Sequence, residues 1–188
     1  MNFSISHITF KKQQLVLLII GVFGLFFGNS NLQAQQATTT INLVLNDVIA
    51  IDPESAANGG NVNFNYEDIH DYNSEKTNNV PNSLIITFSK PFDLKVRANG
   101  THFENGSNSI PVDVLTVKLN ESSSIEGNSA PVVLSTSDQV LISGVGSGSK
   151  LNLDLDYIIP QERSSSSDIL GKPSGSYTQQ VTYTATAL

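Results

Sequence analysis

Apolar and polar side chains alternate with a period of two along four stretches of the chain. In the clearest stretch, Phe92, Leu94 and Val96 alternate with charged residues, so that one face is apolar and the other polar. This period is typical of a β-strand with one buried face, because successive side chains point to opposite sides of a sheet. The stretches predicted as strands are 62–66, 92–99, 151–159 and 177–186.

Weaker alternation predicts further strands within residues 41–51, 84–88, 112–119 and 139–143. No stretch has a convincing apolar spacing of an amphipathic helix. Gly and Asn, which tolerate positive φ, are concentrated between the predicted strands. About eight strands with one apolar face each indicate an all-β protein. We expect an antiparallel two-sheet sandwich, with a closed barrel as the alternative.

Two polar segments do not fit the strand pattern. Residues 68–81 are rich in Asn and Asp, and residues 161–176 contain four consecutive serines. We expect the first segment to form a long loop and the second to form the mobile tip of a hairpin. Long loops on a rigid scaffold often carry function, although a solvated connection is the simpler interpretation of both.

The first 34 residues have the pattern of a secretory signal peptide. Lys11 and Lys12 precede an apolar run over residues 15–27, which is shorter than the about 20 residues that a transmembrane helix needs. Ala34 ends an acceptable cleavage site, and a retained membrane anchor is the alternative interpretation. The prediction is a signal peptide over 1–34, a single β-sandwich domain over 35–188, and export to the periplasm, the outer surface or the extracellular space.

Composition narrows the classes of function. The chain has no Cys, which excludes disulfides and metal sites built on thiolates. Residues 35–188 carry 8 basic and 17 acidic side chains, a net charge of −9, which argues against nucleic acid as a partner. Ser, Thr and Asn make up 49 of these 154 residues, a composition common in surface-exposed, fibre-type or matrix β-proteins.

Candidate catalytic groups are few. His70 and His102 lie outside any metal-binding spacing, and we interpret both as structural or solvated. The chain has no nucleophile elbow, P-loop or dinucleotide-binding glycine motif, and its glycine-rich stretch at 144–148 is interpreted as a turn. We therefore expect no enzymatic activity and no bound cofactor.

Asp154 and Asp156 form the one carboxylate pair that has to be weighed. On a strand they share a face and lie about 6.5–7 Å apart, near the separation used by inverting glycosidases. The simpler interpretation is a solvent-facing strand edge. Together with Asp52 or Glu54 they would offer oxygen ligands to Ca²⁺, although no known calcium-binding spacing is present.

Three stretches resemble a known group of proteins. They are the run LIITFSKPFDLKVRANG at 84–100, SIPV at 109–112 and GSYTQQVTYTAT at 175–186. They are similar to small exported bacterial β-sandwich domains: an uncharacterised surface-protein family of Gram-negative bacteria, the spore-coat-U-like archaic pilins and, more distantly, the WxL cell-wall domains.

The resemblance implies an immunoglobulin-like, non-catalytic sandwich at or outside the cell envelope. It also implies β-strand addition, because pilins of this type complete their sandwich with a strand from a neighbouring subunit or chaperone. The chain departs from these relatives because only residues 35–40 precede the first apolar alternation at Ile41, which is short for a separate donor strand. It also has neither the Cys of many such pilins nor the Trp of the wall-binding domains.

Two functions remain in competition. The first is a structural or adhesive surface subunit, pilus-like or fimbria-like, that acts through β-edge contacts with copies of itself or with other subunits. The second is a binding module for envelope polysaccharide or peptidoglycan. A shallow cleft lined by Tyr66, Tyr72 or Tyr157, with converging Asn and Asp side chains, would favour the second.

Overall fold

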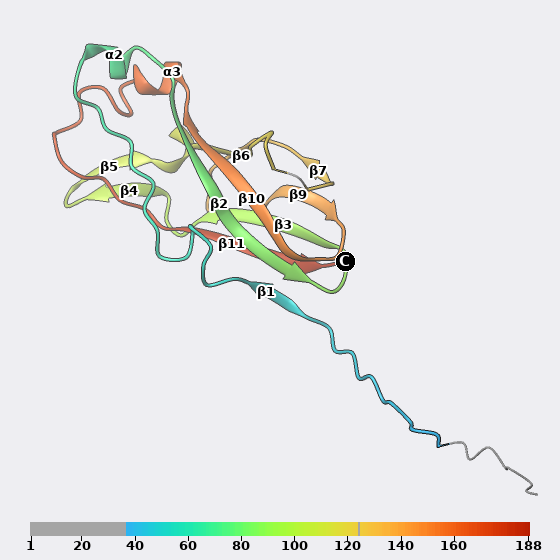
Figure 1. Ribbon diagram of the computed structural model, residues 1–188. Coiled ribbons are helices and arrows are strands. Elements are labelled where there is room, and N and C mark those ends of the chain that lie inside the picture. The colour runs from blue at the N-terminus through green and yellow to red at the C-terminus, as the bar shows by residue number, and fades with distance from the viewer. Residues whose placement is uncertain (1–36, 124) are drawn as a thin grey trace, which may run out of the picture. The chain divides into compact units, whose positions relative to one another are not determined.

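The computed structural model describes residues 37–123 and 125–188, and the predicted signal peptide lies outside them. The described residues are mostly β, arranged as two antiparallel sheets and a separate hairpin (Figure 1). The first sheet has the strand order β1-β2-β10-β6-β8 and the second β11-β3-β9-β7. The predicted all-β, antiparallel architecture with two sheets is confirmed, and within the described residues the sheets stay separate rather than closing into a barrel.

The elements have the following bounds. The first sheet contains β1 (Ile49–Ile51), β2 (Lys76–Phe88), β10 (Gly148–Ile159), β6 (Thr116–Leu119) and β8 (Val132–Val133). The second contains β11 (Val181–Ala187), β3 (Phe92–Ala98), β9 (Gln139–Val145) and β7 (Asn128–Ser129). The hairpin is β4 (His102–Asn105) with β5 (Asn108–Pro111), and the helical turns are α2 (Ile69–Tyr72), η1 (Val112–Val114) and α3 (Gln161–Ser164).

Two of the four stretches with clear alternation lie inside the sheets, as β3 in the second sheet and β10 in the first. In β3 every second residue from Phe92 to Ala98 is buried, and the intervening side chains are only half-buried. In β10 Leu153, Leu155 and Tyr157 are buried on the same principle. The predicted strands at 92–99 and 151–159 are therefore confirmed, because the period of two places one whole row of side chains in the core.

One apolar core receives side chains from both sheets. Leu84, Ile86 and Phe88 enter it from β2, and Phe92 and Leu94 enter it from β3. The chain crosses from the first sheet to the second at residues 89–91, and there the rings of Phe88 and Phe92 stack with centroids 4.4 Å apart. Complete burial stabilises each such side chain by about 1.5–3 kcal/mol, so this crossing holds the two sheets together.

The predicted strand at 62–66 is wrong. Val62, Phe64 and Tyr66 are half-buried against the core while Asn61, Asn63 and Asn65 are exposed, so the alternation of faces is present. The segment has no ladder of backbone hydrogen bonds, and Asn63 interacts through its carbonyl oxygen with the side chain of Asn78 instead. Alternation alone decides which side chains turn inward, whereas a strand also needs a neighbouring backbone to pair with.

The predicted long loop at 68–81 is also wrong. Its first part forms the short helix α2, and from Lys76 onward the chain is already strand β2, paired with β10 as far as Ile159. The polar composition of this half of β2 hid the strand. The ladder is interrupted at Pro81, where β2 carries two more residues than β10 between paired positions and Asn82 adopts a φ of 49°. Such a bulge accommodates a proline, which has no N–H to donate.

Residues 161–176 do not form the hairpin tip that we predicted. They begin with the helical turn α3, and Ser164 and Ile169 are buried, so the segment is packed against the body of the molecule. Ser164 occupies the first position of the serine run, which composition suggests is solvated. Its burial is possible because its hydroxyl bonds with Tyr66.

The predicted strands at 84–88 and 139–143 are confirmed within β2 and β9, whereas the other remaining strands are shorter than expected. Only residues 49–51 of the run 41–51 pair with another strand, and the run 112–119 is divided between η1 and β6. At the C-terminus β11 begins at Val181, and Thr178 makes a single bridge to Glu104. β11 pairs with β3 over seven residues and lies at the edge of its sheet.

Candidate functional site

Two of the three tyrosines proposed as carbohydrate contacts lie together. The rings of Tyr66 and Tyr72 pack with centroids 4.9 Å apart at an angle of 43°, and the ammonium of Lys76 lies 5.7 Å from the centre of the Tyr66 ring. The Tyr66 hydroxyl bonds with Ser164 Oγ at 2.9 Å, and burial raises the pKa of this phenol. The hydrogen bond to Ser164 therefore fixes Tyr66 against α3. The rings of Tyr66 and Tyr72 pack on each other and do not form an open platform.

The helix that carries Tyr72 is held by local electrostatics. The Asp68 carboxylate accepts hydrogen bonds from the backbone N–H groups of His70 and Asp71, and Asp71 accepts one from the backbone of Asp68 in return. Lys76 forms an ion pair with Asp71. The hydrogen bond from Lys76, followed by the backbone bonds from Glu67 and Asp68, lowers the pKa of Asp71 from 3.8 to about 2. These bonds account for a stable helix of only four residues.

Tyr157, the third proposed contact, lies in the core. Its side chain is 5% exposed, and its hydroxyl bonds with Tyr183 at 2.6 Å and with Ser83 at 3.3 Å. Burial raises the pKa of Tyr183 well above its ordinary value, and the neighbouring Tyr157 adds to this effect. The Tyr183 phenol therefore stays neutral, and the hydrogen bond between the two hydroxyls joins β10 of the first sheet to β11 of the second.

The carboxylate pair on β10 is already engaged by hydrogen bonds. Asp154 accepts one bond from the backbone of Asn82 and one from Ser122 Oγ. Asp156 is 6% exposed, accepts bonds from the amides of Asn79 and Asn120, and lies 3.7 Å from Lys118 Nζ. The interpretation as a solvent-facing edge is therefore wrong for Asp156, which connects β2, β10 and β6 across their outer face.

The described residues contain no group of three or more His, Asp or Glu side chains placed to hold a metal ion. Asp52 does not join the pair on β10, because its carboxylate accepts the backbone N–H of Glu54 in a local turn. His70 lies on the exposed side of α2, and His102 Nδ1 interacts with Thr101 Oγ1 at 2.8 Å.

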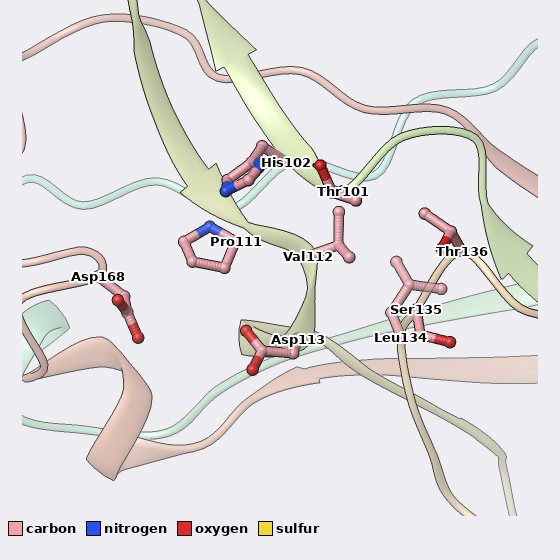
Figure 2. Close-up of a pocket in the computed structure, with 9 residues that line it drawn as sticks. All are labelled: Thr101, His102, Pro111, Val112, Asp113, Leu134, Ser135, Thr136 and Asp168. Carbon is pink, nitrogen blue, oxygen red and sulfur yellow. Dashed lines mark hydrogen bonds between the residues drawn. The ribbon is translucent and has the colours of Figure 1, made fainter.

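A depression of about 440 Å³ lies where the hairpin, η1 and two loops meet (Figure 2). Sequence reasoning did not identify it, because its walls come from four separated segments and no local motif marks any of them. The only lining residue singled out from the sequence was His102. Nine residues line the depression: Thr101, His102, Pro111, Val112, Asp113, Leu134, Ser135, Thr136 and Asp168.

A second surface feature is the N-terminal part of the described chain. Ile41, Leu43 and Leu45 expose 80–87% of their surface, and Val44 exposes 79%. These residues form no strand or helix. Pairing starts only at residues 47–51, where Lys90 binds Asp47, Val48 bonds with Ser89, and β1 pairs with the end of β2. A contiguous apolar stretch of this kind is uncommon on a protein that acts alone.

No family model matches the chain, and a comparison with curated proteins finds no match either. Within residues 37–123 and 125–188, no helix has the length and apolar character needed to span a bilayer.

Proposed function

We propose that this protein is a non-enzymatic, exported surface subunit with an immunoglobulin-like sandwich that assembles by β-strand addition. The observation that carries the proposal is the exposed apolar alternation at residues 41–45. The strand it would add to is β11, in a second copy of the chain.

The donor in this proposal is the segment 38–46. Ile41, Leu43 and Leu45 would share one face of an extended strand, with Asn42, Val44 and Asn46 on the other. Full burial of each apolar side chain would contribute about 1.5–3 kcal/mol. Because these side chains are almost fully exposed in the single chain, that free energy is gained only when a partner covers them.

The acceptor is the open edge of the second sheet. β11 pairs with β3 on one side, and in the described chain no strand pairs with its other side. Its core-facing row, Val181, Tyr183 and Ala185, is half-buried, as the outermost row of a core would be. An unpaired edge of this kind is a template for another strand, which would continue both the backbone ladder and the apolar row.

The apolar row of the donor segment and the apolar row of β11 match in spacing. Three apolar residues at every second position of the donor meet three at every second position of β11, and the alternate positions carry Asn42, Val44 and Asn46 on one strand and Thr on the other. Cross-strand pairs of this kind each stabilise a sheet by about 0.2–1 kcal/mol in addition to the burial of apolar area.

The experiment compares two double variants of the protein that begins at Gln35. Leu43→Asp with Leu45→Asp places two charges on the apolar face, and the control, Asn42→Asp with Asn46→Asp, places the same charges on the polar face. Light scattering after size-exclusion chromatography, over a range of concentrations, should show oligomers for the wild type and the control but monomers for the first variant.

A synthetic peptide of residues 37–46 supplies an independent measurement. We expect it to bind the Leu43→Asp, Leu45→Asp protein, whose own donor is disabled, and to shift the backbone amide resonances of β11. A wild type that stays monomeric at every concentration, together with a peptide that leaves β11 unchanged, would refute strand addition.

A further inference from the structure

The floor of the depression at the hairpin is formed by the half-buried Pro111 and by the small exposed part of Val112 (Figure 2). Val112 is 5% exposed and Leu134 is 0% exposed, so Leu134 supports this floor from behind. Backbone hydrogen bonds hold each side of this floor: Val112 donates to Thr101 at 3.1 Å, and Leu134 donates to Leu115 at 2.8 Å. The walls therefore need little rearrangement to receive a ligand, which lowers the entropic cost of binding.

The polar groups of the depression are positioned by a residue just outside its lining. The guanidinium of Arg163 donates to Asp168 Oδ2 at 3.0 Å and to Asp113 Oδ2 at 2.6 Å. This arrangement orients both carboxylates and leaves the Oδ1 atom of each without a hydrogen bond from the described part of the chain. Figure 2 shows these carboxylates on one side of the depression and Thr136 on the other.

The charge of the depression selects against anions. Two carboxylates and one guanidinium give a net charge of −1, and no lysine lines the depression. A carboxylate or phosphate on the ligand would meet the two free Oδ1 atoms and be repelled. Hydroxyl groups are suited to the same atoms, because a carboxylate accepts hydrogen bonds and has none to donate.

From these features we propose that the depression binds an uncharged sugar unit. Neighbouring hydroxyls would donate to Asp113 Oδ1 and Asp168 Oδ1, and the C–H face of the ring would lie on Pro111 and the exposed edge of Val112. The volume suits one or two pyranose rings, within the range of small-molecule sites in proteins. This site is separate from the β11 edge, so the proposal of sugar binding does not depend on strand addition.

The test is a titration of the isotope-labelled protein, beginning at Gln35, followed by backbone amide resonances. The neutral probes are maltotriose, cellotriose and mannotriose, and the anionic probe is trigalacturonate. We expect at least one neutral probe to shift the amides of Val112, Asp113 and Thr136 with a Kd of about 1 mM, because a single shallow site offers few contacts. Trigalacturonate should leave these amides unchanged.

Two variants locate the site. Asp113→Asn should weaken binding of the neutral probe about tenfold, since a hydrogen bond to a charged acceptor is lost. Asp47→Asn is the matched control, because Asp47 is an exposed aspartate in an ion pair at another place and its loss should leave the Kd unchanged. Thr136→Val, which does not touch the Arg163 contacts, provides a second measurement if Asp113→Asn perturbs the fold.

Three results would overturn the proposal. They are the absence of saturable shifts with all three neutral probes, shifts confined to residues outside the depression, and binding of trigalacturonate as tight as that of the neutral sugars. An unchanged Kd in both Asp113→Asn and Thr136→Val would overturn it as well.

Discussion

Strand β3 and the segment 41–51 carry the same kind of sequence pattern, but the apolar side chains of β3 are buried and those at the start of the segment are exposed. Phe92, Leu94 and Val96 are fully buried, whereas Ile41 and Leu43 expose 87% and 80% of their surface. β3 has a partner strand on each side, and the segment pairs with β2 only at residues 49–51. The comparison shows that alternation creates an apolar face, and that the availability of a partner decides whether this face becomes core.

The test with the largest expected effect removes β11, the edge strand that pairs with β3. Deleting residues 177–188 takes away the seven-residue ladder with β3 and the Tyr157–Tyr183 hydrogen bond. We expect the truncated protein to unfold or to recruit a strand from another copy and form oligomers. Thermal melting and size-exclusion chromatography at equal concentration distinguish these results. A truncated monomer with the melting temperature of the full protein would show that β11 contributes nothing to the fold.

The second test applies one substitution to both regions. Leu94→Ala should lower the free energy of unfolding by about 2–5 kcal/mol, because it leaves a cavity in the core. Leu43→Ala should change the same quantity by less than about 0.5 kcal/mol in the monomer, since that side chain is already in water. Urea denaturation at low protein concentration measures both. Equal losses in the two variants would contradict the difference in burial.

The third test concerns a polar position in the alternation of β10. Asp156→Ala should cost about 1–3 kcal/mol, because Asn79 and Asn120 lose their shared acceptor and Lys118 its counterion. The control is Asp138→Ala, which removes an exposed ion pair with Arg97 and should cost less than about 1 kcal/mol. Chemical denaturation of both variants gives the comparison. If Asp156→Ala were as mild as its control, the outer face of the first sheet would be merely solvated.

The smallest expected effect depends on pH and lies in the loop around α2. The pKa of Asp71 is lowered in the folded protein, so its contribution to stability is complete above about pH 4 and is lost as the pH falls through about 2. Asp71→Asn should therefore lower the melting temperature slightly at pH 7, where the ionised carboxylate contributes fully, and the difference from the wild type should shrink as the pH falls through this window. Asp47→Asn serves as the control. If the melting temperature of Asp71→Asn fell between pH 4 and pH 2 as steeply as that of the wild type, the role of the Lys76 contact would be contradicted.

Two kinds of position were difficult to predict from the sequence. The polar half of β2 was missed because its Asn and Thr residues pair with β10 through the backbone, which leaves no trace in side-chain polarity. The tyrosines were grouped as one possible surface, but Tyr157 points into the core while Tyr66 and Tyr72 pack on each other. An aromatic residue with a hydroxyl suits both environments, since the ring can be buried and the hydroxyl bonded.

The sequence by itself determined the β class, the central strands and most of their buried rows, because a period of two places side chains on one face whatever the neighbours are. It also determined the acidic charge and the absence of thiol chemistry. The order of strands, the edge position of β11, the crossing at Phe88 and Phe92, and the meeting of Asp113, Asp168 and Arg163 were decided only in the tertiary structure. Each of these depends on which distant segments pack together, and packing is a property of the whole chain that no single stretch of it contains.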